Sequence, residues 1–135
     1  ANSIFYEAET LAEDPSKISL KNGCIWKEGK YMVWKSHAKG ETLKLDIPVV
    51  EDTTVNIVLT AAHSPKSGNI SVRLDGKDLK FGSKSIVDLY QKCTIVSRNH
   101  VSKKVKLQEG LHELTIENLE ENLNSIGIDF IWVKY

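Results

Sequence analysis

The alternation that decides the fold class is clearest in the stretch ETLKLDI, residues 41–47. Leu43, Leu45 and Ile47 share one side of an extended chain, because successive side chains of a β-strand point to opposite faces. The polar residues between them face the other side, which predicts a strand with one face in a core and the other in water. Pro48 follows and offers no backbone donor, so the strand either ends there or lies at a sheet edge.

Similar short apolar segments recur along the chain between turn-forming residues. Residues 53–61 are apolar on both faces, as expected for a strand in the middle of a sheet that is covered on two sides. Asp75-Gly76, after a strand expected at 69–74, favours a two-residue hairpin turn. Further strands are expected at 3–10, 78–81, 86–90, 94–98, 101–107, 111–118 and 126–135.

Many short strands and almost no helical pattern predict an all-β fold. A sheet with one apolar face must bury it against a second sheet or close on itself, so the alternatives are a sandwich and a barrel. The segments 3–10 and 126–135, near the two ends of the chain, are expected to pair with each other. At 135 residues with 41% hydrophobic content, the chain is expected to form a single domain spanning 1–135.

Charge and hydropathy exclude several classes of target. Lys and Arg number 18 and Asp and Glu also number 18, spread along the chain, which argues against nucleic acid or an anionic membrane as the main partner. No apolar run reaches the roughly 18 residues that would cross a bilayer. The start, Ala1-Asn2-Ser3, lacks an export signal, so we expect that one was removed or lies upstream in a longer protein.

The two cysteines, Cys24 and Cys93, lack the close spacing of a zinc or redox site. A disulfide between two strands and two separate thiols both remain open.

The sequence resembles a known group of proteins. The resemblance rests on motifs at the two ends of the chain and on three inner motifs that follow in the same order. The chain opens with FYEAE at 5–9 and closes with IGIDFIWV at 126–133, with inner motifs at 29–34, 72–76 and 109–116. Together they are similar to carbohydrate-binding modules of families 6, 35 and 66, which are appended to secreted bacterial glycosidases. The resemblance covers nearly the whole chain and implies a jelly-roll sandwich of two antiparallel sheets.

The resemblance also implies a structural calcium ion where the first and last strands meet. Glu7 and Glu9 would project from one face if both lie on the first strand, and Asp129 on the partner strand would add a third hard oxygen ligand. Backbone carbonyls near residues 27–29, or water, would complete the shell. The alternative is that Glu7 and Glu9 form a solvated strand face that pairs with lysines.

In the resembled modules a sugar is held by aromatic rings in loops at one rim, or on the concave face of one sheet. The apolar face of a pyranose suits a ring, while its hydroxyls need directional partners. Trp26 and Tyr31 bracket the loop 27–30, and Tyr90 precedes another loop, so these three rings are the first candidates. Packing is the alternative role for Trp26 and Tyr31.

Other candidate ligand contacts are polar. Asn122 or Asn124 lies near the amide that accompanies the rings in family 6. Gly127 stands where families 6 and 35 have an asparagine, which shifts the comparison toward family 66. His100, with its neighbour Asn99 and with His63, lies in a turn-like stretch and is either a solvated loop residue or a sugar-hydroxyl contact, whereas Trp34 and Trp132 are expected to pack in the core.

No catalytic motif accompanies this pattern: the chain has no nucleophile elbow, zinc-binding His-Glu-x-x-His sequence or phosphate-binding glycine loop. The sequence therefore predicts a non-catalytic module, expected to be monomeric, that binds an oligosaccharide or polysaccharide for a covalently linked catalytic domain. Its expected location is secreted, periplasmic or at the cell surface. A protein-interaction sandwich, a structural spacer domain and an enzyme built on a sandwich remain as alternatives.

Overall fold

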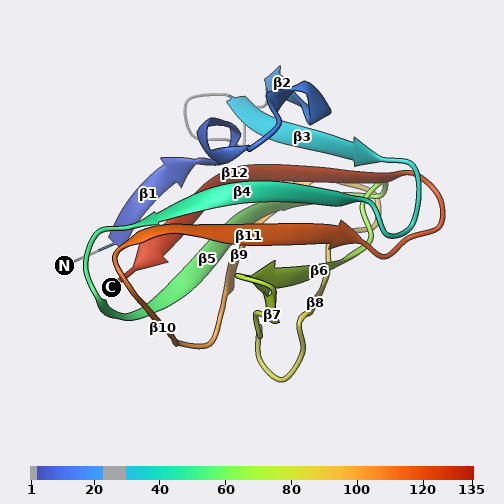
Figure 1. Cartoon of the computed structure of the whole chain (residues 1–135). Coiled ribbons are helices and arrows are strands. Elements are labelled where there is room, and N and C mark those ends of the chain that lie inside the picture. Colours follow the sequence, from blue (N-terminus) through green and yellow to red (C-terminus); the bar gives the residue numbers. More distant parts are fainter. Residues whose placement is uncertain (1–2, 23–29) are drawn as a thin grey trace.

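A computed structural model describes residues 3–22 and 30–135 and shows two β-sheets packed face to face (Figure 1). Two single 3-10 turns, η1 and η2, follow the first strand. In chain order the elements are β1 (Ser3–Glu7), η1 (Ala8–Leu11), η2 (Pro15–Lys17), β2 (Ile18–Asn22), β3 (Lys30–Ser36), β4 (Thr42–Val49), β5 (Thr53–His63), β6 (Asn69–Leu74), β7 (Lys77–Asp78), β8 (Ile86–Asp88), β9 (Val96–Val101), β10 (Val105–Leu107), β11 (Gly110–Asn118) and β12 (Asn124–Lys134).

The strands form a seven-stranded sheet and a five-stranded sheet. The first has the order β10-β5-β12-β3-β2, with β1 also paired to β12 and β9 to β5, and the second has the order β4-β11-β6-β7, with β8 paired to β6. All of these strand pairs are antiparallel. The predicted jelly-roll sandwich is confirmed.

The core lies between the two sheets and is filled from both by the alternation seen in the sequence. Leu43, Leu45 and Ile47 of β4 are at most 1% exposed and pack in one cluster with Ile57 of β5 and Ile116 of β11. At about 25 cal/mol per Å² of buried apolar surface, such a cluster is the main stabilising term of the domain. The predicted assignment of the apolar face of residues 41–47 is confirmed.

The outer edge of β4 is protected along most of its length. Pro48 does not end the strand but lies opposite Leu111 in the edge strand of the five-stranded sheet, where a missing N–H costs no ladder hydrogen bond. Other backbone groups on this edge have partners from outside the sheet. These contacts are Lys17 Nζ to the Thr42 carbonyl at 3.2 Å, the Glu13 N–H to the Lys44 carbonyl at 3.0 Å, and the Val50 N–H to the Tyr135 hydroxyl at 2.8 Å.

The predicted hairpin turn is confirmed. Asp75 has φ 51° and Gly76 has φ 80°, the left-handed conformation that a two-residue turn of this kind requires at both positions. The returning strand β7 pairs Asp78 with Arg73 and is shorter than the predicted strand 78–81.

The predicted break at Asn99-His100 is wrong, because β9 runs through these residues and the interruption comes at 102–104 instead. The polar residues fit inside a strand because each has a cross-strand partner. The Thr60 hydroxyl donates to Asn99 Oδ1 at 2.8 Å, and His100 contacts His63.

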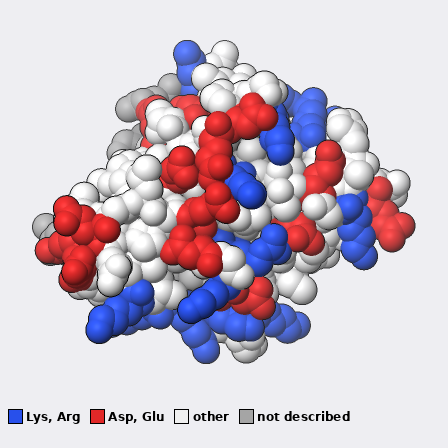
Figure 2. Space-filling view, viewed as in Figure 1, with Lys and Arg blue, Asp and Glu red and all other residues white. Residues whose placement is uncertain are grey.

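The two ends of the described chain lie side by side (Figure 1), as predicted. β1 pairs with β12 in a register that runs from Ser3 opposite Lys134 to Glu7 opposite Phe130. Folding also sorts the charges: Figure 2 shows acidic side chains in a band across the middle of the face and basic ones gathered along its lower side. Among the described residues, no helix is long and apolar enough to span a membrane.

Candidate functional site

The outer face of the seven-stranded sheet, turned away from the five-stranded sheet, carries a buried apolar cluster. In β3, Met32 and Trp34 point into the core, so Tyr31 and Val33 point outward, where they cluster with Ala62 of β5. This confirms the predicted core position of Trp34. Because strands alternate, residues of this face come from the positions between core residues on every strand.

The register of β12 shifts between Ile128 and Phe130, where a bulge lies. Beyond the shift, Ile131 and Val133 belong to the core and Trp132 lies on the outer face. There the ring of Trp132 lies 4.3 Å from that of Phe5, measured between ring centroids. The predicted core position of Trp132 is therefore wrong, because one extra residue in a strand changes which side chains face inward.

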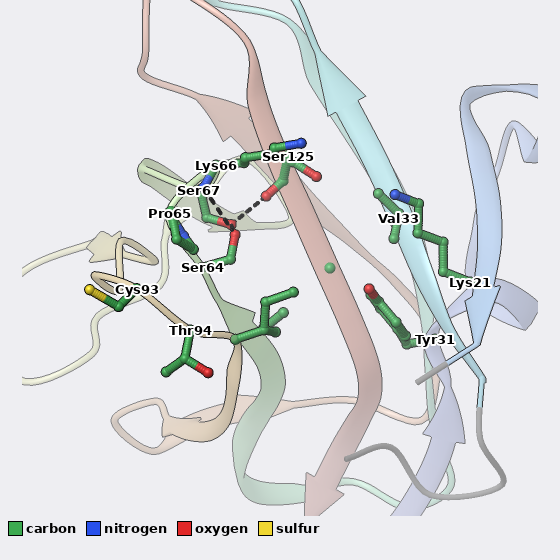
Figure 3. A pocket seen from close by; sticks show the side chains of 13 residues that line it. Lys21, Tyr31, Val33, Ser64, Pro65, Lys66, Ser67, Cys93, Thr94 and Ser125 are labelled. Atoms are coloured by element: carbon green, nitrogen blue, oxygen red, sulfur yellow. Dashed lines mark hydrogen bonds between the residues drawn. The ribbon is translucent and has the colours of Figure 1, made fainter. Parts of the chain in front are cut away.

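A hollow of about 350 Å³ opens on this outer face, and we call it the Tyr31 pocket (Figure 3). Strands β3, β5 and β12 form its floor, and the turns after β5 and before β9 form the opposite wall. Its lining comprises Lys21, Tyr31, Val33, Ala62, Ser64, Pro65, Lys66, Ser67, Cys93, Thr94, Ile95, Ser125 and Gly127.

Gly127 lets the ring of Tyr31 lie close against β12. A Cβ atom at this position would stand 3.0 Å from Cε2 of Tyr31 and 3.0 Å from Cβ of Ala62, closer than ordinary contact. Any larger residue here would push the ring away or close the floor. The glycine that departs from the families 6 and 35 pattern thus sets the shape of this pocket.

Serine hydroxyls form the polar wall opposite Tyr31 (Figure 3). Ser67 Oγ donates to the Ser125 carbonyl at 2.6 Å, and Ser64 Oγ lies 2.7 Å from Ser67 Oγ, so Ser64 donates to Ser67. The Lys66 N–H in turn donates to Ser64 Oγ at 3.2 Å. Each hydroxyl is fixed by the chain and keeps an acceptor lone pair for a hydroxyl group of a ligand.

A second hollow of about 450 Å³ adjoins the first and shares the turn at 65–67 with it. Asn122 lines this second hollow and is exposed, so it remains a candidate contact. Glu120 also lines it, but its Oε2 accepts from the N–H of Asn69 at 2.8 Å and from Asn69 Nδ2 at 3.0 Å, which holds the two segments together.

Asn124 does not face either hollow, which corrects its predicted role as a ligand contact. It is fully buried, and its amide is used by the protein itself. Oδ1 accepts from the Gly68 N–H at 2.9 Å, while Nδ2 donates to the Asn69 carbonyl at 3.1 Å and to Asn118 Oδ1 at 3.0 Å. Asn124 is a structural residue that ties β12 to the start of β6.

Of the three candidate rings, the structure brings Tyr31 into the pocket and Tyr90 beside it. Tyr90 is 54% exposed and does not line the pocket. It forms a parallel β-bridge with Ser64, which does line the pocket. Trp26 lies outside the described residues, as do Cys24 and the loop 27–29. Cys93 is an exposed free thiol in the wall of the pocket.

His100 points into the sandwich rather than toward the pocket, so its predicted sugar contact is not supported. His100 Nε2 lies 2.6 Å from His63 Nε2, and the two rings stack with centroids 4.9 Å apart. Burial lowers the pKa of both imidazoles, and the positive charge of Arg98 lowers each pKa further. Both rings are therefore neutral near pH 7, and one donates to the other.

The expected calcium ligands are brought together only in part. β1 ends at Glu7, and Glu9 lies in η1, so the prediction that both belong to one strand is wrong. The two side chains nevertheless line one hollow, with Leu20 and Lys30. Asp129 is buried at 5% exposure, and within residues 3–22 and 30–135 no three His, Cys, Asp or Glu side chains are grouped closely enough to hold a metal ion. The calcium ion stays a prediction.

The polar wall of Ser64, Ser67 and Ser125 was missed at the level of the sequence. The serines are far apart in the chain, and only the topology brings the turn after β5 against the start of β12. The one available signal was the run His-Ser-Pro-Lys-Ser-Gly at 63–68, whose composition indicates a loop but no ligand.

No protein-family model and no curated protein sequence matches the chain. Solved structures do match. A family 35 carbohydrate-binding module from Clostridium thermocellum aligns with a TM-score of 0.66 and 17% identity over 98% of each chain. The CBM36-1 domain of a multidomain xylanase from the hindgut metagenome of Trinervitermes trinervoides aligns with a TM-score of 0.66 and 9% identity, covering 99% of this chain and 98% of that domain.

The chain also aligns with parts of two larger enzymes. In Paenibacillus xanthan lyase the match has a TM-score of 0.80 and 16% identity and covers 96% of this chain but 13% of that protein. In the exo-β-1,3-galactanase of Phanerochaete chrysosporium it covers 98% of this chain and 29% of that protein, with a TM-score of 0.61 and 19% identity. The chain therefore has the jelly-roll fold of carbohydrate-binding modules, at the size of one module.

Proposed function

We propose that this domain is a non-catalytic carbohydrate-binding module that brings an attached glycoside hydrolase to its glycan. The observation that carries the proposal is the Tyr31 pocket, where one aromatic ring and a fixed row of serine hydroxyls face each other across an apolar floor. A pyranose needs both surfaces, since its carbon-bound hydrogens pack on a ring and its hydroxyls require acceptors and donors.

The pocket volume bears on the size of the ligand. At about 350 Å³ it is at the small end of the roughly 300 to 1,000 Å³ typical of ligand pockets. We therefore propose that it holds one or two sugar units at a chain end or branch, with Lys21 and Lys66 at its rim donating to ring or hydroxyl oxygens. Asn122 in the adjoining hollow would contact the next unit.

The setting of the domain follows from the same proposal. Two of the matching structures are enzymes of which the aligned part is 13% and 29%, which supports a covalently linked catalytic domain. We also propose a secreted or surface location and a monomeric module. No catalytic step is assigned to residues of this chain.

Calcium is a further part of the proposal. Glu7 and Glu9 line one hollow, and the buried carboxylate of Asp129 lies in β12 next to Phe130, which is the residue paired with Glu7. Carboxylate oxygens are the ligands that calcium prefers, and it takes about 6 to 8 oxygens. These residues would hold the ion together with backbone oxygens or water, and the ion would join β1 to β12.

The calcium proposal is tested by thermal unfolding with calcium and with a chelator. We expect calcium to raise the Tm of the wild-type domain and to have no effect on the double variant Glu7→Gln with Glu9→Gln. The control Glu121→Gln changes an exposed carboxylate in the second hollow and should respond to calcium like the wild type. An unchanged wild-type Tm in the presence of the chelator contradicts the proposal.

The glycan proposal is tested with a glycan array, followed by titration calorimetry of the hits. We expect a dissociation constant on the order of 10 μM to 1 mM, equal to roughly 4 to 7 kcal/mol. Thr94 is an exposed residue of the pocket wall, and Thr94→Trp should fill the entrance and weaken binding at least about tenfold, or 1.4 kcal/mol. Leu111→Trp places the same ring at an exposed position of β11 in the five-stranded sheet, outside the pocket lining, and should bind like the wild type.

Two results contradict the proposal. One is the absence of any glycan signal for the folded domain. The other is full binding by Thr94→Trp, which would move the sugar site elsewhere on the surface. Tyr31→Leu, which keeps most of the buried bulk but removes the ring, should weaken binding while circular dichroism confirms the fold.

A protein-interaction domain is the second candidate. One row across the outer face of the seven-stranded sheet joins Phe5, Trp132, Val58 and Val101 on four neighbouring strands. Phe5 is 46% exposed and Val101 is 50% exposed at the two ends of the row. Exposed apolar rows of this kind mark protein contacts in other folds. Capture of a protein partner that Phe5→Ala abolishes, in the absence of any glycan binding, would favour this candidate.

A further inference from the structure

Lysines from two separate segments meet at the edge of the sandwich where β7 and β10 lie. We call this surface the basic edge and define it by six exposed residues. They are Lys77, Lys80, Lys84, Lys103, Lys104 and Lys106. Figure 2 shows Lys and Arg gathered along the lower side of the molecule, where Figure 1 places β10 and the turn that follows β7.

The fold holds the two segments of the basic edge together. The N–H of Lys103 donates to the carbonyl of Lys80 at 2.8 Å, across 23 positions of sequence. Lys77 of β7 and Lys106 of β10 line one and the same groove. Because these links are made by backbone and by edge strands of both sheets, the lysines form a fixed surface rather than a mobile tail.

The two segments that form the basic edge carry a strong excess of positive charge. Residues 77–84 and 103–106 contain the six lysines and a single acidic residue, Asp78, although the whole chain has a net charge of zero. Within the described part of the chain, no ion pair involves any of the six. Clustered positive charge without internal partners attracts an anionic polymer and makes its binding dependent on salt.

A groove of about 890 Å³ runs between the two edge strands, beside the lysines. Its apolar lining comes from both sheets, namely Leu74, Leu79, Val105 and Leu107. Asp52, Asp75, Asp78 and His112 also line it. Asp52 and Asp75 each accept a backbone hydrogen bond, from Glu109 and Glu113 respectively, and Asp75 also contacts the imidazole of His112. The groove thus offers an apolar floor, with lysine ammonium groups and carboxylate oxygens both among its lining residues.

From this arrangement we propose that the basic edge binds an acidic polysaccharide, a chain of sugars that carry carboxylates. The carboxylates pair with the lysines, the carbon faces of the sugar rings cover the apolar floor, and sugar hydroxyls donate to the aspartate oxygens. Nucleic acid fits less well, because no arginine, tryptophan, tyrosine or phenylalanine lines the groove within the described residues. This inference goes beyond the proposed function and does not depend on the Tyr31 pocket.

The test measures binding to polygalacturonate by affinity electrophoresis and calorimetry. Uncharged dextran is the reference polymer. We expect the wild-type domain to bind polygalacturonate and not dextran, with affinity falling as salt rises from about 50 to 200 mM. The variant Lys80→Gln, Lys84→Gln, Lys103→Gln, Lys104→Gln should bind at least about tenfold more weakly. The matched control Lys35→Gln, Lys39→Gln, Lys92→Gln, Lys134→Gln removes the same charge from exposed lysines elsewhere and should lose less than about threefold.

Several outcomes overturn the inference. These are an equal loss in both quadruple variants, no binding to polygalacturonate at low salt, and tighter binding to duplex DNA or to vesicles of anionic phospholipid than to polygalacturonate. Thr94→Trp separates this surface from the Tyr31 pocket. It should leave polygalacturonate binding unchanged, and a loss of that binding would place the acidic polymer in the pocket instead.

Discussion

The outer faces of the two sheets are built differently, although both come from strands with alternating patterns. On the five-stranded sheet the outward residues are charged and partly exposed, and they pair across strands, as Arg73 does with Glu117 at 2.9 Å and Lys44 with Glu113 at 3.7 Å. On the seven-stranded sheet a group of the outward residues is apolar and largely buried. They are Tyr31, Val33, Val58, Ala62 and Phe130.

The difference shows what each face is adapted to contact. The five-stranded sheet meets water directly, and its charged side chains need no cover. The seven-stranded sheet buries its outward residues under Phe5, Trp132 and the turns after β5, and this cover leaves the Tyr31 pocket open. Apolar surface that is kept next to a polar rim is typical of ligand sites, so the ligand is expected on this face.

The largest expected effect comes from adding a charge to the outer face of the seven-stranded sheet, compared with removing one from the five-stranded sheet. Val58 is 1% exposed on the outer face of the seven-stranded sheet, between Trp132 and Val101. Val58→Asp should lower the free energy of unfolding by about 3 to 5 kcal/mol, because a carboxylate is buried without a partner. Lys44→Ala on the five-stranded sheet should cost less than about 1 kcal/mol. Urea unfolding measures both, and similar losses would remove the distinction between the faces.

An exposed apolar residue on each face gives a smaller effect. Phe5 is 46% exposed but lies 4.3 Å from Trp132 and 6.3 Å from Phe130, measured between ring centroids. Phe5→Ala should cost about 1 to 2 kcal/mol and shift tryptophan fluorescence toward longer wavelength as water reaches Trp132. Leu111 is 70% exposed on the five-stranded sheet, and Leu111→Ala should stay within about 0.5 kcal/mol of the wild type. A Phe5→Ala domain as stable as Leu111→Ala would argue against a shielding role for Phe5.

Histidines of the two sheets should give opposite dependences of stability on pH. Burial lowers the pKa of His63 and of His100, and the positive charge of Arg98 lowers each pKa further, while the Asp88 carboxylate opposes the shift at His63. The unfolded chain then takes up protons more readily than the folded one, so the stability that these two contribute is present above their unfolded pKa and is lost as the pH falls.

His112 of the five-stranded sheet behaves in the other sense. Burial alone would lower its pKa, but the Asp75 carboxylate and the Gln108 carbonyl raise it overall. Its contribution is fully present below the unfolded pKa and is lost as the pH rises through the folded pKa. Tm is measured between about pH 5 and 8. As the pH falls, the Tm of His100→Gln should decrease less than that of the wild type, and as the pH rises, the Tm of His112→Gln should decrease less than that of the wild type. Parallel curves for the two variants would contradict this assignment.

The smallest effect is expected for an ion pair on the water-facing side. Arg73 and Glu117 are about one third exposed, at 31% and 27%, so water screens their attraction. A double-mutant cycle of Arg73→Ala and Glu117→Ala should give a coupling of about 0.5 kcal/mol that shrinks at high salt. A coupling above about 2 kcal/mol would mean that this face depends on its charges as much as the other depends on its apolar cover.

The sandwich could be predicted from the sequence because strand alternation is a local property. The core face of residues 41–47, the Asp75-Gly76 turn and the pairing of the two ends all follow from patterns of a few residues. The bulge in β12 could not be predicted, since it depends on how β5 pairs with it, and it moved Trp132 from the core to the outer face.

The site was harder to predict for a related reason. Tyr31 and Asn122 were identified as candidates because of their type and place in a resembled pattern, and both line hollows. Asn124 was not distinguishable from Asn122 in the sequence, since its burial depends on hydrogen bonds to residues about 55 positions away. The basic edge was hidden for the same reason, because its lysines are interspersed with other residues until the strands bring them together.

The protected edge of β4 bears on how copies of this domain behave when crowded. Under the proposed function, a polysaccharide surface would concentrate bound modules, and a bare strand edge at high local concentration allows one chain to extend the sheet of the next. Pro48 and the contacts made by Lys17, Glu13 and Tyr135 leave few groups on that edge for a neighbouring copy to pair with. This side of the fold is thus protected against fibrous self-association at high local concentration.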